Sequence, residues 1–104
     1  MTNKLVKVIK SIKKGKKWTA IFKINNKEKK VNFGFHNLND LKNDYTLHKD
    51  KERRTRYRQR HLKDLLTEKN KKGLGAGALS FYLLWGSSTS LKENIKSYKK
   101  RFNL

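Results

Sequence analysis

One segment of the chain carries no charge, although the protein as a whole is strongly basic. Residues 73–90, GLGAGALSFYLLWGSSTS, hold no charged side chain, whereas the rest of the chain holds 28 Lys or Arg and 8 Asp or Glu. The apolar run inside this segment, residues 76–85, is about half of the roughly 20 residues that a membrane-spanning helix needs. A short helix that is apolar nearly all round is buried, and an unpaired lysine inside it would be strongly unfavourable. The segment therefore predicts a buried helix over residues 76–85, with Leu84 and Trp85 in the core.

The N-terminal third shows the two-residue period of β-strands. Apolar side chains recur at every second position in two runs, at Trp18, Ala20, Phe22 and Ile24 and again at Val31, Phe33 and Phe35. A less regular apolar run precedes them at residues 5–12, and turn-like breaks separate the runs at residues 13–17 and 25–28. Alternation of this kind places one set of side chains on one face of a strand. The pattern predicts a three-stranded antiparallel meander whose apolar face the 76–85 helix covers.

Two further helices are expected in the C-terminal half. Residues 51–66 contain no Gly or Pro and many good helix formers. Ser90 and Glu93 form the sequence signature of a capping box. It is followed by apolar residues at helical spacing, namely Leu91, Ile95, Tyr98 and Phe102. The predicted fold is an α+β single basic domain, 1–104, with a strand region 1–35, a connector 36–50 and a helical region 51–104 that holds three helices.

The net charge of +20 over 104 residues indicates a polyanionic partner. Nucleic acid is the first expectation and an anionic membrane surface the second, without membrane insertion. The eleven aromatic residues argue for a folded domain rather than a solvated tail. The chain has no Cys, so neither a disulfide nor a thiolate metal site can form, and no signal peptide is recognisable.

Arginine is concentrated in one place. Five of the six Arg lie within RRTRYRQR, residues 53–60, in a chain that otherwise uses lysine. Guanidinium groups bind phosphate oxygens in a bidentate fork, so this choice favours phosphate contacts. At 100° per residue, four cations gather on one side of the helix, opposite Tyr57, His61, Leu62 and Leu65. We call them the basic stripe: Arg53, Arg56, Arg60 and Lys63.

Cations outside this stripe are also candidates for binding phosphate. The first turn supplies a second candidate surface for nucleic acid, made of Lys13, Lys14, Lys16 and Lys17. Arg54 and Arg58 flank the apolar side of the helix, and the sequence leaves open whether they are structural or bind phosphate.

The expected function is sequence-nonspecific binding of double-stranded DNA through phosphate contacts, since no base-reading module is recognisable. The protein is not expected to be an enzyme, and no catalytic residue, metal or cofactor is predicted. One alternative is RNA binding, in which Trp18 or Phe33 would stack on bases if exposed. Another is a scaffold that docks acidic protein partners, and a homodimer through part of the apolar surface is also left open. The least favoured is a metal-dependent nuclease using His36, His48 and Asp44, whose spacing matches no specific metal signature.

Three stretches resemble a known group of proteins: DYTLHKDKERRTRYRQRH (44–61), GALSFYLLWG (77–86) and ENIKSYKKRF (93–102). They are similar to small basic proteins of large nucleocytoplasmic DNA viruses, of the marseillevirus type, which are mostly of unassigned function. The resemblance implies action in the virion, or in the cytoplasm or nucleus of the infected cell. Combined with the expected DNA binding, this leads us to expect a role in packaging or condensing a viral genome. The resemblance transfers no catalytic residue to this chain. It does imply a shared motif that contains Arg53, Arg54, Tyr57, Arg60 and His61.

Overall fold

The computed structural model describes residues 3–104, so the first two residues of the predicted strand region lie outside it. The N-terminal third forms a three-stranded antiparallel sheet with the strand order β1-β2-β3. The strands are β1 (Asn3–Lys10), β2 (Lys16–Ile24) and β3 (Lys27–Phe35). The predicted meander is therefore confirmed, and its order follows from the two short connections, which join neighbours in sequence.

The irregular first strand has a local cause. The pairing of β1 with β2 shifts between Leu5 and Lys7, so that Val6 is an extra residue that lies exposed on the sheet. A bulge of this kind breaks the two-residue period. The second connection is a two-residue turn in which Asn25 and Asn26 both have positive φ, 52° and 65°. This is the backbone that the twist of a tight hairpin favours, and asparagine tolerates it.

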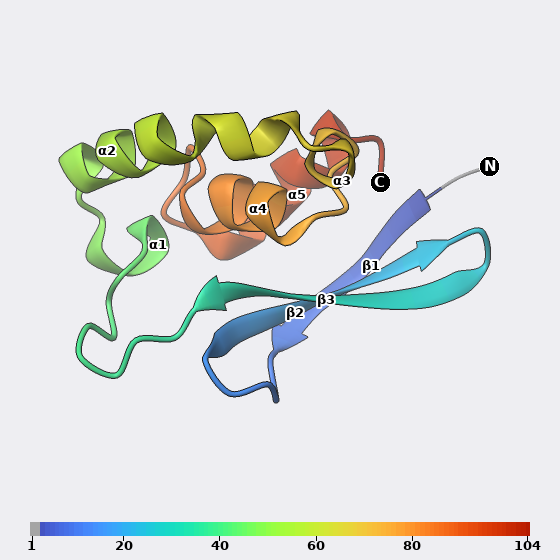
Figure 1. Ribbon diagram of the computed structural model, residues 1–104, viewed down its shortest axis with the longest axis horizontal. Coiled ribbons are helices and arrows are strands. Elements are labelled where there is room, and N and C mark those ends of the chain that lie inside the picture. Colours follow the sequence, from blue (N-terminus) through green and yellow to red (C-terminus); the bar gives the residue numbers. More distant parts are fainter. Residues whose placement is uncertain (1–2) are drawn as a thin grey trace.

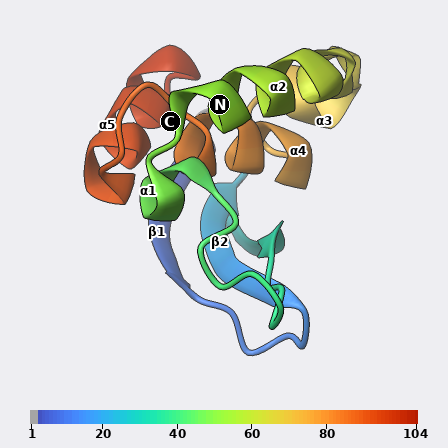
Figure 2. The same cartoon turned by 90° about the vertical axis from the view of Figure 1, so that its left-hand side faces the viewer.

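The helices form a second layer over one face of the sheet (Figures 1 and 2). They are α1 (Tyr45–His48), α2 (Lys51–His61), η1 (Leu62–Leu66), α3 (Glu68–Lys71), α4 (Ala76–Leu79), η2 (Ser80–Leu84) and α5 (Leu91–Arg101). The helix predicted over 51–66 is α-helical to His61 and continues as a tighter 3₁₀ turn. The four-residue helices α1 and α3 were not predicted, because elements so short carry no readable period. The three predicted helices correspond to α2 with η1, to α4 with η2, and to α5, and the α+β class is as expected.

The charge-free segment is buried against the sheet, as predicted. It forms α4 and then η2, whose wider turn is closed by a hydrogen bond from the Trp85 N–H to the Ser80 carbonyl, 3.2 Å. Leu84 and Trp85 are both buried. The core cluster joins this segment to the inner face of the sheet, to α1 and to α5: Leu5, Ala20, Phe22, Phe33, Tyr45, Ala78, Leu79, Leu83, Leu84, Trp85 and Tyr98.

Helix α5 begins where the capping signature placed it. The Ser90 hydroxyl accepts a hydrogen bond from the Glu93 N–H, 3.3 Å. The Ser90 N–H donates instead to the Ser88 hydroxyl, 3.0 Å, so only one half of the capping box is made. Further along, Tyr98 is buried and its hydroxyl donates to the Gly73 carbonyl, 2.5 Å. This bond fixes α5 to the loop that leads into α4.

Candidate nucleic-acid interface

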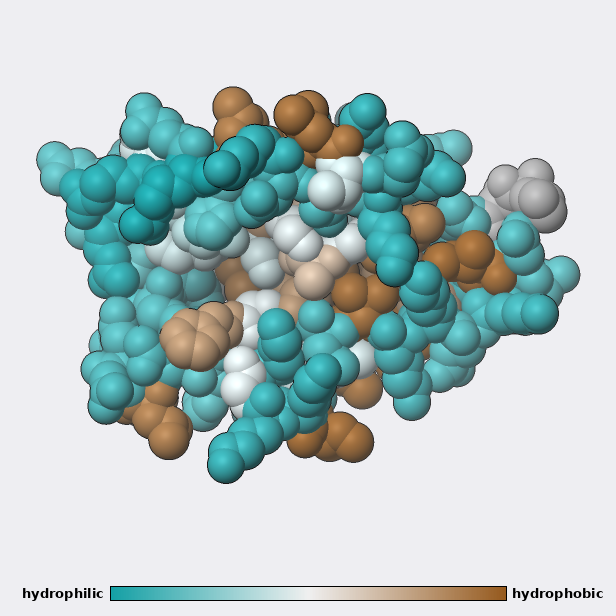
Figure 3. Space-filling view, viewed as in Figure 1, coloured by the Kyte–Doolittle hydropathy of each residue, from teal (hydrophilic) through white to brown (hydrophobic). Residues whose placement is uncertain are grey.

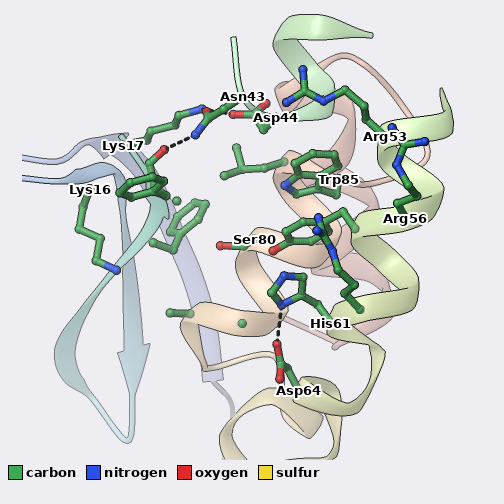
Figure 4. A pocket seen from close by; sticks show the side chains of 18 residues that line it. Lys16, Lys17, Asn43, Asp44, Arg53, Arg56, His61, Asp64, Ser80 and Trp85 are labelled. Atoms are coloured by element: carbon green, nitrogen blue, oxygen red, sulfur yellow. Dashed lines mark hydrogen bonds and ion pairs between the residues drawn. The ribbon is translucent and has the colours of Figure 1, made fainter. Parts of the chain in front are cut away.

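A cleft of about 690 Å³ opens between the sheet and helix α2 (Figure 4). Helix α2 forms one wall, the start of β2 and the end of β3 form the other, and α4 with η2 forms the floor. In Figure 3 most of the surface over the helices and the sheet is hydrophilic, with brown apolar side chains at the upper and lower edges, and the band between the two layers contains paler and brown residues. The cleft thus has a less polar floor between two polar walls.

The start of α2 is held in place by its neighbours in sequence. The Asp50 side chain accepts hydrogen bonds from the N–H groups of Glu52, 3.0 Å, and Arg53, 3.3 Å. The Asp50 N–H donates to Nδ1 of His48, 2.8 Å, and Lys49 between them has a left-handed backbone with φ of 59°. Helix α2 therefore starts at a fixed angle to α1, which sets the direction of its basic residues.

Three of the four residues of the basic stripe line the cleft. Arg53, Arg56 and Arg60 lie along its helical wall together with Tyr57, whereas Lys63 is exposed but does not line the cleft. The expectation that the stripe faces away from Tyr57 is therefore wrong for these three. The helix packs on the core through a side on which Arg54 and Arg58 lie, so the stripe is lateral to the core rather than opposite to it.

The cations of the cleft differ in how they are paired. A guanidinium nitrogen of Arg53 lies 3.2 Å from a carboxylate oxygen of Asp40. Arg56 lies 4.0 Å from Glu52, and both side chains are largely exposed, so this pair is weak. Among residues 3–104, Arg60 and Lys16 form no ion pair. Arg56, Arg60 and Lys16 are therefore the cations best able to take a phosphate.

The sheet wall brings Lys16 and Phe35 to the cleft. The two residues are partners in the register of β2 and β3. Phe35 is 65% exposed, so the expectation that it shares the buried face with Phe33 is wrong. The strand changes its course at Gly34, which has a left-handed backbone with φ of +82°. A residue with a side chain would be strained in this conformation, and its Cβ would also clash with the Leu84 side chain. The last aromatic residue of β3 is thereby turned out to the rim.

Lys17 has a different environment from Lys16 although it is the next residue. Its ammonium group is buried and contacts the Asp44 carboxylate and the side-chain oxygen of Asn43. Asn43 in turn donates to the Phe35 carbonyl, 3.0 Å. Lys17 joins the connector to the sheet, so we leave it out of the phosphate-binding set.

An aromatic column stands behind the helical wall. The Tyr57 ring stacks on Trp85 with a centroid distance of 4.1 Å and an interplanar angle of 4°, and on His61 at 4.2 Å and 28°. Burial raises the pKa of Tyr57 to about 12, because the charged phenolate would lose its hydration. The phenol therefore keeps its proton at neutral pH and offers the cleft a hydroxyl group. His61 is held by Asp64, with 2.8 Å between its Nδ1 and the carboxylate oxygen.

The roles of Arg54 and Arg58, which the sequence left open, are structural. Nε of Arg54 donates to the Gly86 carbonyl, 2.6 Å, and a guanidinium nitrogen of Arg58 donates to the Trp85 carbonyl, 2.7 Å. The Arg58 guanidinium also lies over the Phe81 ring, 4.1 Å from its centroid. Burial lowers the pKa of Arg58, and the nearby Arg54 adds to this effect. Both side chains bind the carbonyl end of the buried helical segment.

The residues considered for a nuclease do not gather. One carboxylate oxygen of Asp44 contacts Lys17, and the other accepts from the N–H and hydroxyl of Thr46. The His48 ring packs against Trp85, 5.2 Å between centroids, and His36 lies exposed in the connector. Within the described part of the chain, no three His, Asp or Glu side chains are grouped so that they could hold a metal ion.

The remaining candidates are spread over the molecule. Lys13 and Lys14 are exposed in the turn between β1 and β2, outside the cleft. Phe33 is fully buried and offers no surface for a base, and Trp18 is half-buried beside the core. Phe33 therefore cannot provide the stacking surface that the RNA-binding alternative needs. Phe35, which was expected on the buried face of the sheet, is instead an exposed aromatic side chain at the cleft rim.

Comparison with known proteins gives one match. Residues 6–61, more than half of the chain, match DUF5754, a family of unknown function. The chain belongs to the DUF5754 family. In this DUF5754 protein the matched segment runs from β1 to the last residue of α2, and so it contains both cationic walls of the cleft. No curated protein and no solved structure matches this DUF5754 protein. None of its helices within residues 3–104 is both long and apolar enough to span a membrane.

Proposed function

We propose that the protein binds nucleic acid without sequence specificity, with double-stranded DNA as its main ligand. The observation that carries this proposal is the charge of the cleft. Cations stand on both walls, at Lys16 on the sheet and at Arg56 and Arg60 on the helix, and the two buried or half-buried carboxylates in it, Asp44 and Asp64, already have partners. The cations of the cleft outnumber its two carboxylates, and a groove of net positive charge concentrates anionic ligands.

The geometry supports contacts to the phosphate backbone rather than to bases. Arginine at positions 56 and 60 is one helical turn apart, about 6 Å along the axis. Successive phosphates of one strand are separated by a distance of the same order, so neighbouring arginines can contact neighbouring phosphates. Phosphate contacts position a protein on DNA and carry no sequence information directly.

The resemblance to small basic proteins of large nucleocytoplasmic DNA viruses suggests where such binding acts. We place it in the packaging or condensation of a viral genome, in the virion and in the infected cell. A net charge of +20 suits this role because each bound protein neutralises many phosphates.

The test is a mobility-shift titration with double-stranded DNA, single-stranded DNA and RNA at several salt concentrations, with and without magnesium. The cleft variant combines Lys16→Gln, Arg56→Gln and Arg60→Gln. Three lost phosphate contacts should lower the slope of log affinity against log salt by about 2.7, equally on unrelated duplexes. Arg53 is kept because its ion pair with Asp40 joins α2 to the connector.

The matched control removes the same charge elsewhere. Lys92→Gln, Lys96→Gln and Lys99→Gln change three exposed lysines of α5 and leave the cleft intact. The control should retain most of the salt slope. An equal loss of salt slope in both variants would mean that binding depends on positive charge spread over the whole surface. If RNA or single-stranded DNA binds more tightly than the duplex, that nucleic acid is the ligand instead of double-stranded DNA. Cleavage that requires magnesium would favour the nuclease instead.

A further inference from the structure

A second hollow lies at the end of the sheet next to the connector, and it shares Lys16, Lys17 and Asp44 with the cleft. It has a volume of about 620 Å³, and it is formed by the turn between β1 and β2, by the connector and by α1. Nine large apolar side chains are exposed within residues 3–104, and four of them line this one hollow. These four are Ile12, Leu38, Leu41 and Leu47. Scattered exposed apolar residues are ordinary, but a cluster around one concavity marks a binding surface.

The rim of this hollow is basic. Lys10, Lys13, Lys14 and Lys16 line it, and no ion pair involves any of them in the described part of the chain. The single acidic side chain that lines it, Asp44, is neutralised by Lys17. The surface therefore brings exposed apolar side chains together with positive charge that no described carboxylate pairs.

We propose that this hollow docks an acidic segment of another protein, one that inserts apolar side chains between Ile12, Leu38 and Leu41. Apolar anchors in a pocket with a charged rim are the usual composition of a specific interface. The positive rim selects the partner by charge and speeds the encounter. This proposal does not depend on nucleic-acid binding, because its apolar side chains lie outside the cleft and only Lys16 among the proposed phosphate contacts also lines the hollow.

Two other occupants fit the observations less well. A second copy of the chain would carry the same lysines, and a two-fold contact would bring the positive rims together. A lipid bilayer presents a flat surface, whereas the apolar side chains here surround a concavity. An inserted side chain from a protein fills that concavity.

The experiment uses the full-length protein and three short synthetic peptides in a fluorescence anisotropy titration. The first peptide is an amphipathic sequence of Glu and Leu, the second replaces Leu by Ser, and the third replaces Glu by Lys. The first should bind more tightly than either of the others by about tenfold or more, because it alone supplies both negative charge and apolar anchors. The hollow variant combines Ile12→Ser, Leu38→Ser and Leu41→Ser, and it should lose this binding by a similar factor.

The control variant removes three exposed apolar side chains of the same kind elsewhere, Val6→Ser, Leu62→Ser and Leu66→Ser. It should bind the first peptide like the parent protein, and both variants should melt like the parent because all six side chains are exposed. Equal binding of the Glu–Ser peptide, or preference for the Lys–Leu peptide, would overturn the proposal. Tighter binding to phosphatidylserine vesicles than to the first peptide, if it depends on the same three residues, would also overturn the proposal. A dimer of the parent protein that is lost only in the hollow variant would do the same. Duplex binding in the mobility-shift assay should be unchanged in the hollow variant, which separates this test from that of the proposed function.

Discussion

His48 lies where the connector, α2 and the buried helical segment meet. Its Nδ1 accepts the N–H of Asp50, and its Nε2 is buried without a hydrogen-bond partner within residues 3–104. Burial lowers the pKa of His48 below its ordinary value, and the positive charge of Arg53 adds to this effect. Protonation of Nδ1 would also remove the acceptor that holds the residue at the start of α2. A neutral His48 is therefore part of the folded structure.

A pH dependence of stability follows from this. Because the folded pKa is lowered, the unfolded chain binds more protons, so the free energy of unfolding is largest above the unfolded pKa of about 6.5 and falls as the pH drops towards the folded value. His48→Asn keeps an acceptor near the position of Nδ1 but cannot titrate, and it should remove this loss between pH 7.5 and pH 5.5 in urea titrations. The exposed His36→Asn variant should keep the full loss. A parent protein no more acid-sensitive than His48→Asn would refute this role of His48.

The neighbours Lys16 and Lys17 show a limit of sequence reasoning at this scale. One is an exposed cation of the cleft, and the other is buried against Asp44, which lies 27 positions away in the sequence. Both lie at the start of β2, where the strand period separates neighbours onto two faces but does not indicate which of them meets a carboxylate. The pairing depends on how the connector folds back on the sheet, which neither composition nor spacing reveals.

Among the helices and strands, the elements with a strong local signal were predicted and the others were not. The alternation around Phe22 and Phe33, the charge-free run and the cap at Ser90 each depend on a few neighbouring residues, and the structure confirms all three. The side of α2 that carries the stripe was misjudged. Tyr57 follows Arg53 by four residues and precedes Arg60 by three, so the spacing alone places it only about 40° and 60° from them around the helix. The direction of the core depends further on where the buried segment packs. Arg54 and Arg58 define that direction, and their partners lie about 30 residues away.

Arginine side chains of α2 bind the carbonyl end of the buried segment, and their contribution to stability can be measured by comparing Arg58 with Arg60. Arg58→Ala leaves the carbonyls of Trp85 and Phe81 without their charged donor and removes the contact over the Phe81 ring. We expect the free energy of unfolding to fall by roughly 2–3 kcal/mol. Arg60→Ala, two positions along the same helix, removes an exposed arginine with no ion pair in the described residues and should change it by less than about 0.5 kcal/mol. Equal effects in chemical denaturation would show that Arg58 is not a structural cap.

For the whole molecule, the balance of charge dominates. Four ion pairs of Lys or Arg with Asp or Glu form among the described residues, and only that of Lys17 with Asp44 is buried. Most of the 28 Lys and Arg therefore repel one another in the folded state. Such repulsion destabilises a compact chain and is weakened by salt.

The melting temperature should therefore rise with sodium chloride concentration at neutral pH. For a domain of this size, each kcal/mol gained corresponds to about 4–8 °C. Inorganic polyphosphate should raise it further at low salt, because a ligand that binds only the folded state stabilises it. Differential scanning calorimetry measures both effects. A melting temperature that falls or stays constant as salt is added would mean that the folded state gains from its surface ion pairs more than it loses by repulsion.

The position of the buried helical segment has a consequence for the boundaries of the molecule. The family match ends at the last residue of α2, but the side chains that cover Phe22 and Phe33 come from residues 76–85, beyond that end. Taken alone, the matched segment would leave an aromatic sheet face in water, and a small uncovered sheet is marginal at best. The unit that folds is therefore larger than the matched segment, and a chain that shares only that segment must bring its own cover.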